Sequence, residues 1–243
     1  MQLVLVGFAL FFAVSLTVGV RLLALAARSR QAPELLIGLG VLGIGPVGFG
    51  LQTVAGRVGD YALAEQLATA GAVAVAVGIW AKLAFNWLVY RRGSRAALAV
   101  MLTLGAAVAA QLLAQPLVGS FLEADRHVGL AAARGALQAA ALGWGSLEAF
   151  AYWIQLRRRA RLGLSEPVLV NRFVLWAISA GAAALGTAIG VAASVVTGRP
   201  IQQIPAVLAS ASAFGLVAAL GMWLAFAPPR VYARWIAAGR SRA

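Results

Sequence analysis

Cysteine is absent from this sequence, and histidine occurs only once, as His127. Without cysteine the chain forms no disulfide bond, binds no iron–sulfur cluster and builds no thiolate zinc site. A single histidine is also too little for a histidine-based metal centre. We therefore expect no metal ion and no other cofactor.

Charged side chains are scarce as well: they make up 11% of the 243 residues, whereas 62% of the residues are hydrophobic. Soluble globular domains average about 25% charged and about 45–50% apolar residues. This composition excludes a soluble domain, a disordered chain and a nucleic-acid-binding domain, and it predicts an all-α integral membrane protein. Catalytic motifs are missing too, because there is no HExxH, no phosphate-binding loop and no Ser/His/Asp set. We therefore do not expect an enzyme.

What the sequence does contain is a series of seven apolar runs. A membrane-spanning helix needs about 20 predominantly apolar residues, and each run is long enough. The fifth run is the least apolar, because it contains Arg134 and Glu148. Since the separators are short, we expect residues 1–243 to form a single seven-helix transmembrane domain. The expected helices comprise residues 3–27, 35–56, 63–90, 96–119, 128–156, 171–197 and 203–227.

Basic residues outnumber acidic residues by 20 to 7, and they lie in short clusters between the apolar runs. The first, third and fifth loops and the tail hold thirteen of them, namely Arg28, Arg30, Arg91, Arg92, Arg95, Arg157, Arg158, Arg159, Arg161, Arg230, Arg234, Arg240 and Arg242. The other loops hold three, namely Arg57, Arg126 and Arg199. Because basic loops stay in the cytoplasm, we expect the N-terminus outside and the C-terminus inside. Anionic lipid headgroups are the partners expected at the cytoplasmic face.

Two stretches of the chain resemble each other, which suggests an internal repeat. Aligning Pro33 with Pro167 gives an offset of 134 residues, and aligning Trp87 with Trp223 gives 136. The sequence thus predicts repeats over 1–95 and 128–235, joined by a connector helix at 96–119. A shift of four helices preserves orientation, so the repeats would be parallel. The alternative is that two membrane loops share Arg and Pro by chance.

The stretch LGLSEPVLVNRFVLW, with FNWLVYRR at the end of the third expected helix, resembles a group of uncharacterised bacterial seven-helix membrane proteins. The resemblance covers little more than these two stretches and implies no activity. A 3+1+3 layout is also similar to SWEET-type sugar transporters and to seven-helix receptors and rhodopsins, at the level of fold alone. The bias towards Arg, Ala and Gly is typical of GC-rich bacterial genes, so we expect the bacterial inner membrane.

Small residues mark two helices for close packing. The sixth expected helix has Ala182, Gly186, Gly190 and Ser194 at a spacing of four, which favours a seat for another helix of the same chain over a homodimer seam. The second has six glycines around Pro46. That helix is either a hinge lining a cavity or a tightly packed one, and we favour packing.

Ionisable residues inside a membrane are candidate functional sites. Glu148 and Lys82 each lie nine residues before a basic cluster, about 13 Å along the helix, so they are expected at matching depth. They either pair as an internal brace, or Glu148 lines a cavity that binds a cation, proton or polar ligand, or Lys82 snorkels. Trp144 is expected in mid-span, whereas Trp176 and most other tryptophans are expected toward helix ends, in the aromatic belts at the membrane interfaces. The ligand-binding or ion-coupling candidates are Glu148, Lys82, Trp144, Gln138 and Asn86.

A second motif lies on the cytoplasmic side and comprises Glu166, Pro167, Asn171 and Arg172. Arg172 can pair with Glu166, and Asn171 can cap the start of the sixth expected helix. We interpret both as structural. The acidic residues of the outer loops are interpreted as a solvated rim rather than a ligand site, and they are Asp60, Glu65, Glu123 and Asp125. In the tail, Val231 with Trp235 and Tyr232 with Ile236 predict either a short amphipathic helix on the inner leaflet or a frayed basic end.

These observations favour a ligand-sensing or regulatory membrane module that works through a protein partner or as a homo-oligomer. A small-solute or ion transporter is the first alternative, and a structural subunit of a membrane complex is the second.

Overall fold

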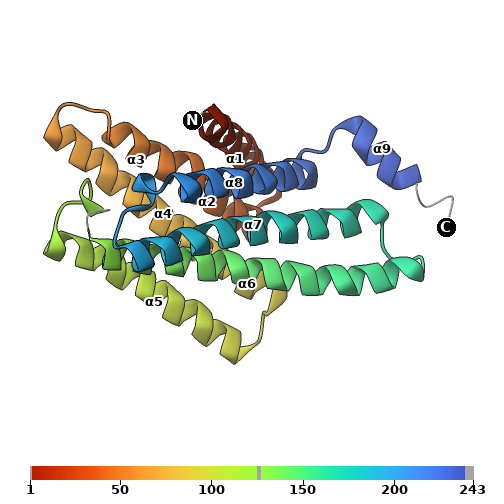
Figure 1. Ribbon diagram of the computed structural model, residues 1–243. Coiled ribbons are helices and arrows are strands. Elements are labelled where there is room, and N and C mark those ends of the chain that lie inside the picture. The colour runs from red at the N-terminus through yellow and green to blue at the C-terminus, as the bar shows by residue number, and fades with distance from the viewer. Residues whose placement is uncertain (1, 125–126, 239–243) are drawn as a thin grey trace.

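The computed structural model describes residues 2–124 and 127–238, and within these ranges the chain is helical with no strand (Figure 1). Asp125 of the outer loops, together with Arg126, Arg240 and Arg242, lies outside the described residues. The α-helices are α1 (Gln2–Ser29), α2 (Ala32–Leu42), α3 (Gly50–Ala55), α4 (Tyr61–Tyr90), α5 (Arg95–Val118), α6 (Val128–Arg161), α7 (Pro167–Thr197), α8 (Pro205–Phe226) and α9 (Arg230–Ala238). The π-helix η1 (Gly43–Phe49) joins α2 to α3, and the 3-10 turn η3 (Ile201–Gln203) precedes α8.

Among the described residues, six helical segments are long and apolar enough to cross a membrane, which confirms a helical chain with several segments that could span one. They are Val6–Ser29, Ala32–Ala55, Tyr61–Tyr90, Arg95–Val118, Pro167–Thr197 and Pro205–Phe226. The fifth expected helix is present as the 34-residue α6 but is not among the six. Its Arg134, Gln138, Glu148 and terminal arginines make it the most polar of the long helices.

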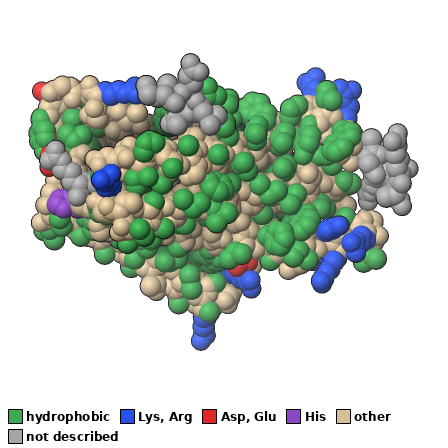
Figure 2. Space-filling model, viewed as in Figure 1, with side chains coloured by type: hydrophobic (Ala, Val, Ile, Leu, Met, Phe, Trp, Pro, Cys, Tyr) green, Lys and Arg blue, Asp and Glu red, His purple; other side chains and the backbone are tan. Residues whose placement is uncertain are grey.

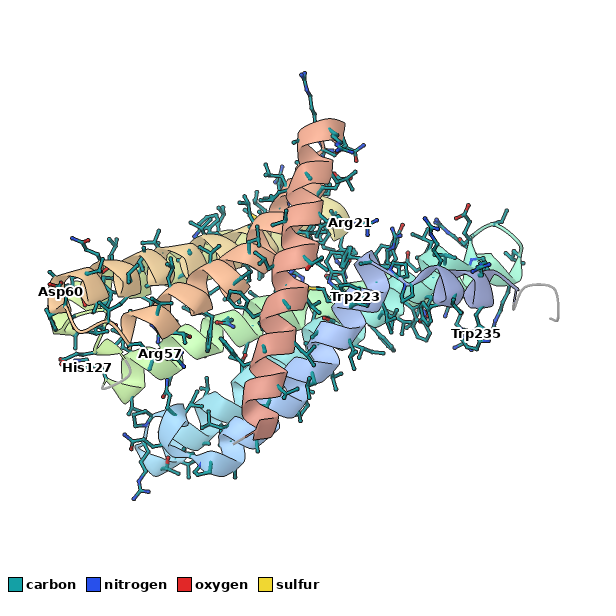
Figure 3. The ribbon with its side chains drawn as sticks, turned by 90° about the horizontal axis from the view of Figure 1, so that it is seen from above. Arg21, Arg57, Asp60, His127, Trp223 and Trp235 are labelled. Carbon is teal, nitrogen blue, oxygen red and sulfur yellow. The ribbon has the colours of Figure 1, made fainter. Side chains whose placement is uncertain are left out.

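The long helices pack in a closed ring of successive contacts. The segment α2–η1–α3 lies along α4, α4 contacts α6, α6 contacts α7, α7 contacts α8, and α8 returns to α1, which contacts α2. Helix α5 lies outside this ring against α4 and α6. Figure 3 shows α1 crossing the other helices at a steep angle, so that it spans the gap between α2 and α8.

The glycine-rich second helix is both broken and tightly packed. Gly45 has non-helical torsions (φ −87°, ψ −107°) beside Pro46, and the surrounding residues form η1. A Cβ atom at Gly43 would lie 2.6 Å from the carbonyl oxygen of Ala74, and one at Gly78 would lie 2.7 Å from the backbone nitrogen of Ile44. Because backbone meets backbone here, only glycine fits at these two positions, and the expected tight packing is confirmed.

The small-residue stripe of α7 seats another part of the same chain, as predicted. All four of its members are buried. A Cβ atom at Gly186 would lie 3.0 Å from Cβ of Phe214 in α8, and one at Gly190 would lie 3.0 Å from Cδ1 of Ile201 in η3. The stripe is therefore already occupied, and the alternative of a homodimer seam at this face is wrong.

Side-chain hydroxyls tie neighbouring helices to each other's backbone. Ser146 of α6 donates to the carbonyl oxygen of Ala177 at 2.8 Å, and Ser179 of α7 donates to that of Ala218 at 2.7 Å. Such bonds hold helices together where packing against lipid supplies no hydrophobic driving force. They fix α6, α7 and α8 as one side of the ring.

Candidate functional site

The interior of the ring is lined by apolar side chains from six helical segments. Val18 and Leu22 of α1 meet Ile37 and Val41 of α2 and Ala149 of α6. The buried residues of α7 and α8 that join them are Trp176, Ala177, Ala180 and Met222. Polar groups in these surroundings are expensive to bury, so each one is a candidate for function.

Lys82 of α4 is a charged side chain that packs against this interior. Its stem packs on α2 at Gly40, where a Cβ atom would lie 2.9 Å from Cγ of Lys82. Its ammonium nitrogen lies 5.6 Å from the centre of the Trp176 ring, within the range of a cation–π contact. Among the described residues Lys82 has no carboxylate partner and no hydrogen bond. The positive charge is therefore held by an aromatic face alone.

Trp176 belongs to a connected set of rings, which we call the aromatic cluster. Its indole stacks on Phe85 with ring centres 5.1 Å apart and meets Phe226 edge-on at the same distance. The set continues from Phe85 to Tyr90 and, through Tyr152, to Phe173. Trp176 is only 9% exposed. The expectation that it sits in an interfacial belt was thus wrong, because its ring turns inward to Lys82.

Four buried polar atoms in the described part of the chain have no hydrogen-bond partner: Ser15 Oγ, Glu34 Oε2, Trp87 Nε1 and the Tyr90 hydroxyl. Ser15 of α1 is 1% exposed and packs on the break in η1, since a Cβ atom at Gly45 would lie 3.2 Å from its own Cβ. An unsatisfied buried polar group costs about 1–3 kcal/mol. The Ser15 and Tyr90 hydroxyls therefore carry an unfavourable burial energy that no described partner offsets.

Glu148 lies at the edge of the bundle and not in this interior. Its Oε1 accepts a 2.8 Å bond from Nε of Arg91 and a 3.1 Å bond from Nε1 of Trp144. Arg91 is the residue that follows α4, so Glu148 is level with the α4–α5 turn. The hydrogen bond that Arg91 donates to Glu148, together with the negative charge of that carboxylate, raises the pKa of Arg91.

The expected matching depth of Glu148 and Lys82 is therefore wrong, and the ion pair between them is not formed. Helix α6 continues for thirteen residues beyond Glu148, past the end of α4. The Arg157 cluster thus lies beyond the level of Arg91. Counting back from Arg157 therefore places Glu148 deeper in the bundle than it is. Lys82 precedes Arg91 by nine residues, about 13 Å along the helix. The two charges are separated by that depth.

Three other sequence candidates lie around α6. Asn86 is 2% exposed and donates to the carbonyl oxygen of Ala141 at 3.3 Å, so it joins α4 to α6. Trp144 is committed to Glu148 by the bond above. Gln138 is half-buried on α6 and, within the described residues, makes no hydrogen bond.

The second motif is brought to the base of α9 rather than to the interior. Helix α7 begins at Pro167 with Glu166 as its N-cap, so Asn171 lies inside the helix and the expectation that it caps the start is wrong. Its Nδ2 instead donates to the Tyr232 hydroxyl of α9 at 2.9 Å. Arg172 lines a small pocket beside that bond. In the described ranges Arg172 forms no ion pair with Glu166, contrary to one expectation.

The outer loops use their acidic residues to hold the backbone. Asp60 caps α4 by accepting a bond from the Leu63 N–H, and Glu65 accepts bonds from the N–H groups of Phe121 and Leu122 at 2.8 and 2.9 Å. The described residues contain no group of three side chains able to hold a metal ion. Figure 3 shows Asp60 and His127 at this end of the molecule, opposite Trp235. Asp60 and Glu65 therefore bind backbone N–H groups, a structural role that differs from the solvated rim expected for these carboxylates.

A pocket near this end lies between α4, α5 and α6 and includes Gln111, Phe121 and Arg134. Its volume of about 10 Å³ is room for a single water molecule. It is too narrow for a solute.

No protein-family model, curated protein or solved structure matches the chain. The chemistry of the site therefore follows from its own residues. A lysine that packs on Gly40 and meets Trp176, without a carboxylate among the described residues, is an unpaired positive charge in apolar surroundings, and a small anion is the kind of ligand that such a charge favours.

Proposed function

We propose that the chain is a multi-pass membrane protein with seven crossing helices, in which α6 crosses with the six more apolar ones. Helix α6 packs between α4 and α7 in the ring, so a membrane that holds those two also holds α6. Polar groups of α6 have protein partners: the Ala141 carbonyl accepts a bond from Asn86 of α4, and Glu148 pairs with Arg91. Lipid would not satisfy these groups.

The same proposal places the basic end of the molecule in the cytoplasm of a bacterial cell, in the inner membrane. We define the basic end by Arg91, the arginines from 157 to 161, and α9. Figure 2 shows basic side chains gathered at the end that carries the α6–α7 turn, with hydrophobic side chains over the middle. Basic loops are retained on the cytoplasmic side, which supports this orientation.

We infer that the protein binds a small anion in the ring interior and passes the binding event to a partner, as a ligand-sensing or regulatory module. The observation that carries this proposal is the Lys82 ammonium, which is held by Trp176 without a carboxylate. A lone charge in an apolar interior is unfavourable, and an anionic ligand removes the penalty by pairing with it. The closely packed apolar walls favour an enclosed site over an open path.

The first test is ligand-dependent thermal stability of the purified protein in detergent. The probes are acetate, benzoate and inorganic phosphate, each added at rising concentration. A ligand at 100 times its dissociation constant stabilises the folded state by about 2.7 kcal/mol. We expect at least one probe to raise the midpoint of unfolding, and Lys82→Met to abolish that rise.

Arg95→Gln is the matched control, because it removes one positive charge from an exposed position at the start of α5. It should leave the probe-induced rise intact. The proposal fails if none of the three anions shifts the midpoint, or if the shift persists in Lys82→Met. It also fails if Arg95→Gln loses the shift equally, because the anions would then bind by surface charge.

Transport of a small solute is the second candidate, and the break at Gly45 favours it. Broken helices supply polar backbone groups at the binding sites of many transporters. The contact pattern supports the 3+1+3 repeat as well, since α1–α2–α4 and α6–α7–α8 are each sets of neighbours and α5 lies outside the ring. The two sets meet through α4 with α6 and through α8 with α1.

Uptake into proteoliposomes separates the two candidates. A labelled form of the anion that stabilises the protein would be offered to sealed vesicles, with Lys82→Met vesicles as the control. Accumulation that depends on Lys82 supports transport. Stabilisation without accumulation supports a sensor. If the anions cause neither stabilisation nor accumulation, both the sensor and the transporter are overturned, and a structural subunit is the remaining alternative.

A further inference from the structure

Helix α9 lies beyond the end of α8 and beside the beginning of α7 (Figure 1). It presents two different apolar faces. Tyr232 and Ile236 turn inward and line a pocket with Val168 and Leu224. Val231 and Trp235 turn outward and are 72% and 73% exposed. A helix of nine residues that leaves a tryptophan this exposed has an unfilled apolar face.

The inward face is fixed in orientation by a directional bond. Asn171 of α7 donates to the Tyr232 hydroxyl at 2.9 Å, and Ile236 follows Tyr232 one turn later in the same pocket. Since residues advance by about 100° around a helix, holding Tyr232 and Ile236 inward directs Val231 and Trp235 away from the bundle. The outward face is thus set by the fold.

Positive charge borders the outward face. Arg230 and Arg234 are exposed and lie on the same side of α9, next to Val231 and Trp235, and no acidic residue occurs in the helix. The last turn of α6 adds Arg158, Arg159 and Arg161 at the same end of the molecule. A partner for this face therefore needs an apolar region to receive Val231 and Trp235, with negative charge beside it to meet the arginines.

We propose that the outward face of α9 binds the surface of an anionic lipid leaflet. Val231 and Trp235 enter the boundary of the acyl chains, and Arg230 and Arg234 bind the headgroup phosphates. The tether supports this occupant over a soluble partner, because only three residues separate α9 from the membrane-crossing α8. The inference shares membrane insertion with the proposed function but does not depend on ligand binding.

The experiment uses the absence of cysteine from the sequence, since Trp235→Cys creates a single thiol in these 243 residues. That thiol would carry an environment-sensitive bimane label in nanodiscs of pure phosphatidylcholine, or of equal parts phosphatidylcholine and phosphatidylglycerol. We expect a blue shift and quenching by lipid-borne bromine in the anionic discs, both reduced by high salt. Ile236→Cys is the matched control, and its label should respond equally little to the two lipids.

Charge variants test the headgroup part of the proposal. Arg230→Gln and Arg234→Gln should each weaken the phosphatidylglycerol-dependent response by about fivefold, the effect of one basic residue near a charged membrane. Arg95→Gln should leave it unchanged. A label that stays in water in both discs overturns the proposal. A label shielded equally in detergent, with cross-linking between chains at position 235, also overturns it and assigns the face to a second copy.

Discussion

The interior around Lys82 and the edge around Glu148 differ more than their sequences suggest. Each charged residue lies nine positions before an arginine cluster, yet Lys82 meets an indole and Glu148 meets a guanidinium. The difference arises because α4 ends at Tyr90 while α6 continues to Arg161. Distance from a charged loop along one helix therefore does not measure depth, which depends on where the neighbouring helices end.

Of the changes that test this comparison, replacing Lys82 is expected to have the largest effect on stability. Lys82→Met removes an unpaired charge from the interior and fills its place with an apolar side chain of similar length. We expect the free energy of unfolding to rise by about 1–4 kcal/mol, measured by denaturant titration in detergent. The free energy of unfolding should not rise in Lys82→Arg, which retains the charge. A fall in stability for Lys82→Met would show that the ammonium has a favourable partner in the folded protein.

The close packing that encloses the interior is tested next. Gly43→Ala places a methyl group against the backbone of Ala74, so we expect a loss of about 1–3 kcal/mol of stability. Gly215→Ala is the control, because a Cβ atom there meets nothing within 4 Å. It should be neutral or stabilising by up to about 1 kcal/mol. Equal losses at both positions would mean that the contact between η1 and α4 is looser than described.

Mutations of the Arg91–Glu148 pair at the edge should change the free energy of unfolding much less than mutations in the interior. The Arg91 side chain is 53% exposed and the Glu148 side chain 12%, and exposed ion pairs contribute about 0–1 kcal/mol. A double-mutant cycle with Arg91→Gln and Glu148→Gln should give a coupling energy in that range, decreasing as salt is added. A coupling above 2 kcal/mol would place the pair in a lipid-like environment and remove the contrast with Lys82.

The smallest expected effect is at α9. Tyr232→Phe removes one hydrogen bond to Asn171, so only the docking of α9 should weaken. We expect amide hydrogen exchange in α9 to accelerate by about two- to tenfold, which corresponds to about 0.5–1.5 kcal/mol. The unfolding midpoint of the bundle should remain unchanged. A lowered midpoint would mean that α9 unfolds together with the ring.

Features set by local sequence were predictable. The apolar runs gave the long helices, and the spacing of Gly186 and Gly190 gave a packing face, because both depend on helical period alone. The helix at residues 230–238 also followed from the i, i+4 spacing of its apolar residues. The glycines around Pro46 indicated close packing in the same way, although not the π-helical geometry of the break.

Features that depend on three helices meeting were not predictable. Trp176 was expected to be an interfacial anchor. Its contact with Lys82 across the ring could not be predicted, because nothing near Trp176 in the sequence indicates it. Ser15 gave no signal, since a lone serine in an apolar helix most often bonds its own backbone. Asn171 looked like a cap because the start of α7 was placed four residues late. Pro167, which suits the first position of a helix, was the available signal.

The contact between α1 and α8 has a consequence for how the protein is made. These helices close the ring, yet they stand at opposite ends of the order of synthesis. At typical translation rates of about 5–20 residues per second, α1 is synthesised on the order of ten seconds before α8 is complete. During that time Gly7 lacks its packing contact with Ser212 of α8. Closure of the ring therefore waits for α8, and truncation before Pro205 would leave α1 without its contacts to α8 and the ring open.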